Sequence, residues 1–62
     1  MKYTVEIFKV NNKYVAKCTE LNIEVLGDTE ADAKQNFVQE LILYSKKNNT
    51  FIDFVWEYNI DK

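Results

Sequence analysis

Hydrophobic and polar residues alternate along the first half of the chain with the period of two that is typical of half-buried strands. The alternation predicts strands over residues 2–10, 14–19 and 23–26, with a hairpin turn at Asn11-Asn12. In the first strand it separates a side with Tyr3, Val5 and Ile7 from a side with Thr4, Glu6 and Phe8. In the second strand it separates Tyr14, Ala16 and Cys18 from Val15, Lys17 and Thr19.

The period then changes to that of an amphipathic helix over residues 30–47. Thr29 is a favourable N-cap residue, and Asp32 three positions later suits a capping box. Gly27, the only glycine, marks the end of the preceding strand, and the pair Asn48-Asn49 marks the break after the helix. One narrow apolar stripe of this helix consists of Ala33, Phe37, Leu41 and Tyr44, flanked by Val38 and Ile42.

Residues 51–60 are the most strongly apolar strand candidate, and we expect them not to form an exposed edge. The order of elements predicts a single α+β domain over residues 1–62, β-β-β-α-β, with an antiparallel meander and one helix on one face. The other face of the sheet then has no cover. The apolar residues able to point toward it are Phe8, Val10, Val15, Phe51 and Val55.

An uncovered apolar face predicts association with a partner or with a second copy of the chain. For self-association into a homodimer or tetramer, the candidate contact residues are Phe8, Val15 and Val55. Leu43 falls on the polar side of the predicted helix, where it is either a single exposed leucine or part of a contact outside the monomer.

Composition limits the chemistry. The chain has 62 residues, no histidine and a single cysteine, so it has neither an internal disulfide nor a Cys/His metal cluster. Cys18 lies in a strand-like run and is interpreted as a small buried hydrophobe. We expect a cytoplasmic protein, because no signal segment and no membrane-spanning apolar stretch is present in the sequence.

Charge favours a basic partner over nucleic acid. The net charge is −2 and all positive side chains are lysines, which argues against sequence-specific DNA binding because arginine is the usual reader of guanine. The stretch from residue 20 to residue 32 carries five acids and no lysine, a local field suited to a basic protein. The same acids also serve to solvate a loop and cap a helix. The candidate partner contacts are Glu20, Glu24 and Asp28.

A weaker hypothesis is RNA binding by the first hairpin. Lysines lie along it beside two aromatic residues on which bases can stack. Scattered lysines on a two-stranded hairpin are more often solubilising edge charges. The residues concerned are Lys2, Lys9, Lys13, Lys17, Phe8 and Tyr14.

Three sequence segments form a pattern found in a known family. They are Lys2-Tyr3-Thr4-Val5, then Tyr14-Val15-Ala16-x-Cys18-x-Glu20-Leu21, and then Gly27-Asp28-Thr29 followed by Ala33 and Asn36. Together these segments resemble the N-terminal domain of the HicB-like antitoxin family. The resemblance implies a partial RNase H-like sheet with the last strand beside the first. It also implies a function, which is to bind a small basic HicA-like ribonuclease toxin and cover its active site.

The chain departs from the family pattern in two places. Thr19 and Asn22-Ile23 stand where family members usually carry proline and a Pro-Gly step, so the loop between the second and third strands is expected to differ in shape. Family antitoxins also usually continue into a C-terminal DNA-binding domain, whereas this sequence stops after the fourth predicted strand. The resemblance therefore implies a stand-alone neutralising domain or a self-associating relative.

Catalysis is not expected. Without histidine and with one glycine, the chain has no Ser/His/Asp triad and no glycine-rich phosphate loop. RNase H-type nucleases hold metal with carboxylates from the first strand, the helix and the fourth strand, where this chain has Glu6, Glu40 and Asp53. The alternation places Glu6 opposite the helix and Glu40 on the outer side of the helix, so the three should not converge on a metal. We therefore predict a binding module without a cofactor.

Overall fold

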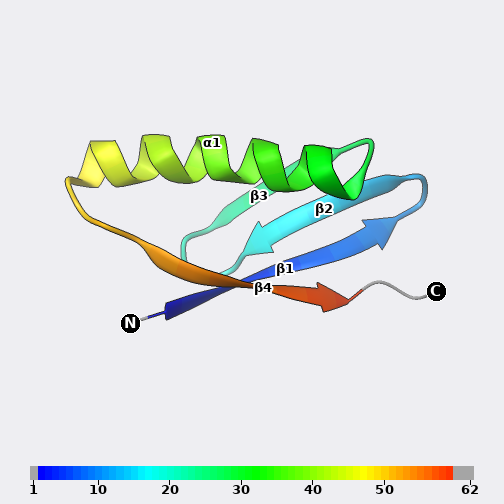
Figure 1. The fold of residues 1–62 in the computed structure, drawn as a ribbon, viewed down its shortest axis with the longest axis horizontal. Coiled ribbons are helices and arrows are strands. Elements are labelled where there is room, and N and C mark those ends of the chain that lie inside the picture. The colour runs from blue at the N-terminus through cyan, green and yellow to red at the C-terminus, as the bar shows by residue number, and fades with distance from the viewer. Residues whose placement is uncertain (1, 60–62) are drawn as a thin grey trace.

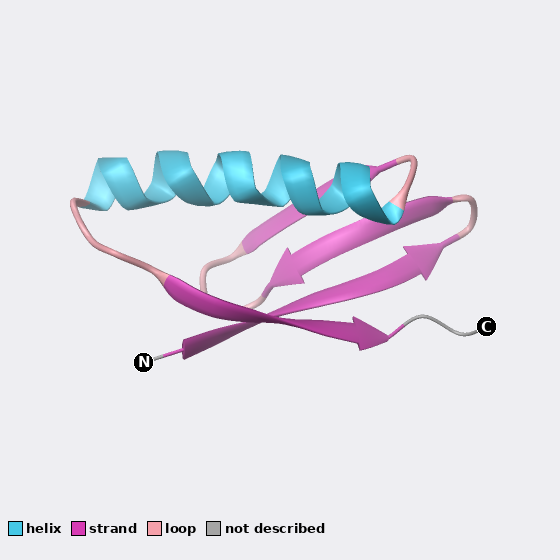
Figure 2. Cartoon of the chain, in the orientation of Figure 1, coloured by secondary structure: helices cyan, strands magenta, loops and turns pink. Residues whose placement is uncertain are grey.

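A computed structural model describes residues 2–59, which form one four-stranded sheet and one helix (Figure 1). The elements follow the order β-β-β-α-β, so the predicted α+β class is confirmed. Figure 2 shows the helix lying along one face of the sheet as a separate layer. The elements are β1 (Lys2–Val10), β2 (Lys13–Cys18), β3 (Ile23–Gly27), α1 (Glu30–Asn48) and β4 (Asp53–Asn59).

The sheet is mixed, with the strand order β3-β2-β1-β4. β1, β2 and β3 form the predicted antiparallel meander, with Phe8 opposite Val15 and Val15 opposite Leu26. β4 instead lies parallel to β1, with Lys2 opposite Asp53 and Phe8 opposite Asn59. A helix that crosses over the sheet returns the chain to the end where β1 began, and parallel pairing follows from this return.

β4 lies at an edge of the sheet, so the expectation that this strand is not an exposed edge is wrong for the single chain. The strand is also shorter than predicted. α1 ends at Asn48, and its C-cap residue Asn49 has the left-handed conformation. The Ser45 carbonyl accepts the Thr50 amide, and the Ser45 hydroxyl donates to the Thr50 carbonyl. These bonds hold the chain against the helix end, so the strand begins only at Asp53. Ile60, the last residue of the predicted strand, lies outside the described residues.

The core lies between α1 and the sheet. The predicted inward residues of β1 and β2 are buried, except for Tyr3 and Tyr14, which are partly buried against the core. Most of the predicted helical stripe is buried as well. Phe37 lies at the centre, with its ring centroid 6.0 Å from that of Phe54 and 5.9 Å from that of Trp56. Aromatic contacts thus join β4 to the core. The buried cluster consists of Val5, Ile7, Ala16, Cys18, Leu21, Ala33, Phe37 and Leu41.

The junction between β3 and α1 explains the single glycine. Gly27 has no positive φ angle, so left-handed backbone is not the reason for it. A Cβ atom at this position would lie 2.3 Å from the Ala33 nitrogen and 2.8 Å from the Ala33 Cα. Only glycine lets the first turn of α1 approach β3 this closely. Directly after it, the Thr29 hydroxyl accepts the Asp32 amide at 3.1 Å, as the predicted N-cap requires.

Candidate functional site

The face of the sheet opposite α1, here called the open face, carries a group of neighbouring apolar side chains. Phe8 and Leu26 flank Val15 from the two adjacent strands. They cover Val15 so well that it is only 3% exposed, although no further layer formed by residues 2–59 lies above it. Val10 extends the group toward the hairpin turn and is 46% exposed. We name these four residues, Phe8, Val10, Val15 and Leu26, the open-face patch.

The open-face patch lies in a shallow depression of about 480 Å³ with charged residues at its rim. Lys13 and Glu24 contribute that rim, together with Asn11 from the hairpin turn. An apolar centre with a polar rim is the usual arrangement of protein–protein interfaces. The arrangement can therefore hold another protein surface by burial of apolar groups, without chemistry of its own.

The three residues predicted for self-association do not form one group. Phe8 and Val15 are direct cross-strand neighbours in the patch. Val55 lies opposite Thr4 on the other edge strand, four positions from Phe8 along β1. At the rise of a strand this separates the two rows by about 13 Å. Leu26 was not among the predicted open-face residues, although the inward positions of Ile23 and Val25 imply by alternation that it points outward.

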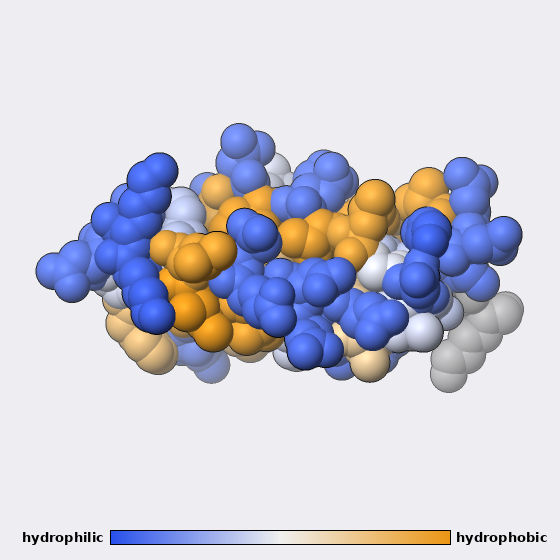
Figure 3. Space-filling view, turned by 90° about the horizontal axis from the view of Figure 1, so that it is seen from above, coloured by the Kyte–Doolittle hydropathy of each residue, from blue (hydrophilic) through white to orange (hydrophobic). Residues whose placement is uncertain are grey.

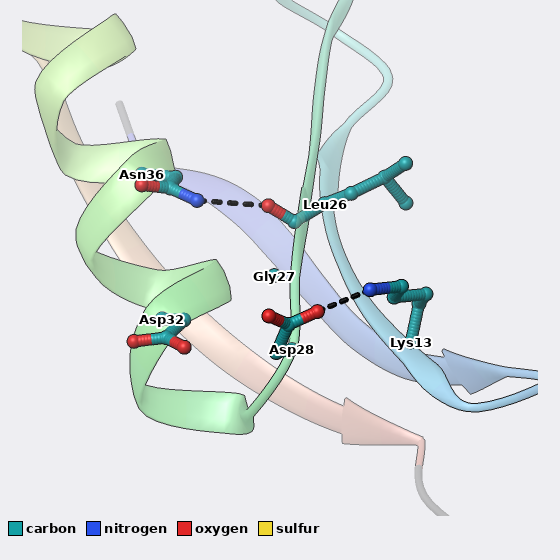
Figure 4. Close-up of a pocket in the computed structure, with 6 residues that line it drawn as sticks. All are labelled: Lys13, Leu26, Gly27, Asp28, Asp32 and Asn36. Atoms are coloured by element: carbon teal, nitrogen blue, oxygen red, sulfur yellow. Dashed lines mark hydrogen bonds and ion pairs between the residues drawn. The ribbon is translucent and has the colours of Figure 1, made fainter.

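The acidic residues predicted to bind a partner lie around β3, at the opposite edge from β4. Glu20 lies in the β2–β3 turn and Glu24 on the exposed side of β3. Asp28 is paired with Lys13 of the first hairpin, as Figure 4 shows. The hydrogen bond from Lys13 and its positive charge hold the pKa of Asp28 below the ordinary value of 3.8. The acidic field is thus partly offset by lysines from the next strand, since Lys17 also lies opposite Glu24.

The lysines of the first hairpin are divided between the two faces of the sheet. Lys9 lies on the helix side, with its Nζ 5.7 Å from the centroid of the Tyr14 ring. Lys13 and Lys17 alternate with the buried helix-side residues of β2 and lie on the open face. Lys17 there has Glu6 opposite on β1 and Glu24 opposite on β3. A continuous basic strip for RNA, as the weaker hypothesis requires, is therefore not formed by these residues.

Phe51 does not contribute to the open face, contrary to the prediction. It precedes β4, is 87% exposed, and lines a groove on the helix side with Ile42 and Ile52. In Figure 3, which views the helix side, the largest group of hydrophobic atoms lies at the end where α1 finishes. Leu43 is 61% exposed on the outer side of the same helix.

The carboxylates considered for a nuclease do not come together. Glu6 lies on the open face, where Asn59 donates to it at 3.3 Å, whereas Glu40 is exposed on α1. Asp53 starts β4 and lies opposite Lys2 at the far end of β1 from Asn59. Among residues 2–59, no three histidine, cysteine or acidic side chains are grouped as metal binding requires. The same residues include no helix with the length and apolar character needed to cross a membrane.

Two further features of the helix side were not predicted. Lys34 lies over β4, with its Nζ 4.5 Å from the Tyr58 ring centroid and 5.5 Å from that of Trp56, and it donates to the Tyr58 hydroxyl. That hydrogen bond raises the pKa of Lys34 above its usual value. Asn36 donates to the Leu26 carbonyl at 2.8 Å and joins α1 to β3 (Figure 4). Both contacts depend on how α1 is oriented over the sheet, and this orientation cannot be predicted from residue spacing alone.

No family model matches this chain, and neither the curated proteins nor the solved structures provide a match.

Proposed function

We propose that this chain is a non-enzymatic protein-binding domain that uses the open-face patch to cover a small basic protein. The resemblance to HicB-like antitoxins suggests that the partner is a basic ribonuclease toxin, neutralised by occlusion of its active site. The observation that carries the proposal is the open-face patch itself, an apolar group on a sheet face that the described part of the chain leaves without a second layer. A face of this kind gains free energy when another protein surface removes it from water.

The charges around the patch support a basic partner. Glu24 lines the patch directly, and Glu20 and Asp28 lie at the two ends of β3. Lys13 and Lys17 reduce this field but do not reverse it, since these two lysines stand beside three acidic side chains. Exposed rim charges of this kind act mainly on the association rate and on partner choice. The apolar patch is therefore expected to determine the affinity of the complex. The acidic side chains are expected to determine how fast a basic surface associates.

The test mixes the purified chain with the small basic, histidine-containing protein encoded by a neighbouring gene. Light scattering measures the mass of the mixture, and an RNA cleavage assay measures whether the chain suppresses ribonuclease activity. We expect a stoichiometric complex and loss of cleavage. A neighbourhood without any such gene, or a mixture that behaves as two independent proteins, would contradict the antitoxin function.

Two leucines of equal exposure provide a matched pair of variants. Leu26 in the patch is 60% exposed and Leu43 on the outer side of α1 is 61% exposed. Leu26→Gln should weaken the complex by about tenfold or more, as loss of a central interface contact does, whereas Leu43→Gln should leave it unchanged. Equal effects of the two variants would assign binding to some other surface.

The second candidate is self-association through the same patch, favoured because Phe8 and Val15 already lie together there. In that case the chain forms a homo-oligomer in the absence of any other protein, and Leu26→Gln lowers the measured mass of that homo-oligomer. A homo-oligomer that binds none of the basic candidate proteins would favour this alternative. If Leu26→Gln abolishes the toxin complex but leaves the mass of the chain alone unchanged, neutralisation is favoured.

A further inference from the structure

β4 is an exposed strand edge with few of the features by which proteins usually block such edges. It contains no lysine and no proline, and its two charged residues, Asp53 and Glu57, are both acidic. Its pairing with β1 runs through seven consecutive positions without a bulge. Alternate residues of an edge strand present their amide and carbonyl groups outward, and none of the described loop and turn hydrogen bonds reaches β4.

The other edge of the sheet is protected. The Asn36 side chain donates to the Leu26 carbonyl of β3, and α1 packs closely along that strand. By contrast, within residues 2–59 the backbone of α1 makes no close approach to the backbone of β4. The contacts place α1 over β3 and β2, and in Figure 1 β4 lies on the other side of these two strands from α1. Space for another strand is therefore available beside β4.

We infer that β4 pairs antiparallel with β4 of a second copy of this chain, which joins the two sheets into one of eight strands. This surface is separate from the open-face patch, so the inference does not depend on the proposed function. The partner is argued from charge and register. A strand that pairs with itself must avoid placing its own acids opposite one another, since like charges directly opposite are destabilising.

Three antiparallel registers place the two-fold axis near the middle of β4, at Val55, Trp56 or Glu57. With the axis at Val55, Asp53 lies opposite the second copy's Glu57. With the axis at Glu57, the two Glu57 side chains oppose each other. With the axis at Trp56, Asp53 lies opposite Asn59 and Glu57 opposite Val55, so no acids are paired. Charge therefore selects the Trp56 register.

The Trp56 register also gives the longest pairing. Trp56 is the middle residue of Asp53–Asn59, so all seven residues find partners. On the helix side, Trp56 then faces its own copy and Phe54 faces Tyr58, and cross-strand aromatic pairs of this kind stabilise antiparallel sheets. The two helices lie over the outer parts of the joined sheet, because each covers β3 and β2 of its own chain.

Disulfide trapping tests the register directly. The Trp56 register brings position 55 of one chain opposite position 57 of the other, within the Cα separation that a disulfide spans. A mixture of Val55→Cys and Glu57→Cys should therefore crosslink under mild oxidation faster than either variant alone. Native Cys18 is fully buried, and Cys18→Ala in both variants removes it from the reaction. Lys17→Cys, on the open face of β2, serves as the control for pairing through sheet faces.

A charge exchange at one position provides the second measurement. Val55→Glu places a carboxylate opposite Glu57 of the other chain, whereas Val55→Lys places an ammonium there. The dimer dissociation constant should rise about three- to tenfold for Val55→Glu and fall for Val55→Lys, with both variants folded by circular dichroism. Light scattering of the unmodified chain should give twice the chain mass of 7.4 kDa.

The possible results separate this inference from the proposed function. A chain that stays monomeric at high concentration, or one whose Lys17→Cys variant crosslinks better than the mixed pair, would overturn the β4 interface. Neither result changes the expected effect of Leu26→Gln on a toxin complex. Loss of toxin binding in Leu26→Gln, with β4 crosslinking intact, would confirm that the two surfaces act independently.

Discussion

At the scale of single residues, Gly27 is required because a side chain would clash with the neighbouring helix, and not because the backbone needs a positive φ angle. The chain uses asparagine where φ is positive, at Asn11, Asn22 and Asn49, and keeps glycine for the one close approach between α1 and β3. Asparagine tolerates left-handed backbone because its side chain bonds nearby main-chain groups. The two requirements are therefore met by two different residue types.

Gly27→Ala should destabilise the protein, because its methyl group would meet the backbone of Asp32 and Ala33, which no side-chain rotation can relieve. We expect a loss of about 1–3 kcal/mol in the free energy of unfolding, measured by urea denaturation. Gly27→Asn is the informative control. If lack of space is the reason for glycine, Gly27→Asn should lower the free energy of unfolding more than Gly27→Ala does. If backbone conformation is the reason, Gly27→Asn should lower it less.

Cys18 provides a pH-dependent prediction. Burial raises the pKa of its thiol above 9.0, the value expected in the unfolded chain. Above that pH the unfolded chain loses a proton that the folded chain keeps, so stability should fall as pH rises from 9 toward the folded pKa. Urea denaturation between pH 7 and about 10 should show this decline, and Cys18→Ala should reduce its slope. An identical slope in the variant would show that Cys18 is not the source of the decline.

At the scale of elements, α1 depends on how its first turn is capped. Thr29 has extended backbone angles and accepts the Asp32 amide, while Glu30 and Asp32 place negative charge at the positive end of the helix dipole. Lys46 and Lys47 complement the other end. All of these features follow from local sequence, which is why the helix start was predicted to the residue.

Thr29→Ala should lower stability by about 1 kcal/mol, since it leaves an amide in the first turn without its acceptor. Thr29→Ser keeps the hydroxyl and should restore nearly the full value. Thermal unfolding followed by circular dichroism at the helix wavelength measures both variants. If Thr29→Ser were as unstable as Thr29→Ala, the methyl group of Thr29, and not its hydroxyl, would be the important contact.

The elements themselves were predictable because their patterns are local. Alternation located β1, β2 and β3, and the helical stripe identified Ala33, Phe37 and Leu41 as buried. The limits of β4 were not predictable, because the tie between Ser45 and Thr50 depends on how the helix ends in space. The parallel direction of β4 was also not fixed by its own residues, since it results from the crossover of α1.

The candidate site was predicted only in part, for a similar reason. Phe8 and Val15 were placed on the open face by alternation, but the complete burial of Val15 depends on Leu26 across the sheet. The acidic stretch looked unopposed along the sequence, yet Lys13 and Lys17 lie beside it in space. Register between strands therefore decides which residues share a surface, and register cannot be derived from a single strand.

At the scale of the whole molecule, residues 2–59 leave both the open-face patch and the outer edge of β4 without a cover. A domain of 62 residues buries a smaller share of its surface on folding than a larger domain does, so its stability is expected to be modest unless association adds to it. The two surfaces point in different directions, since the open-face patch faces perpendicular to the sheet and the outer edge of β4 faces sideways in the plane of the sheet. A dimer through β4 therefore leaves both open faces accessible to other proteins.

Association through β4 should make the unfolding temperature depend on protein concentration, because the dimer forms only from folded chains. The midpoint should rise across a hundredfold range of concentration, more steeply for Val55→Lys than for Val55→Glu. Differential scanning calorimetry at several concentrations measures this dependence. A midpoint that stays constant over the range would argue that the folded unit is a single chain.

The pairing of β1 with β4 also affects the order in which the domain is completed during synthesis. β1 is made first and has β2 as an early neighbour, but its other side waits until the helix and β4 have followed. Contacts between segments so distant in sequence form late and slow folding. Until then β1 is itself an unpaired edge, and Phe54 and Trp56 have not yet covered Phe37. The nascent chain is thus most exposed to misassociation in the interval between the helix and the last strand.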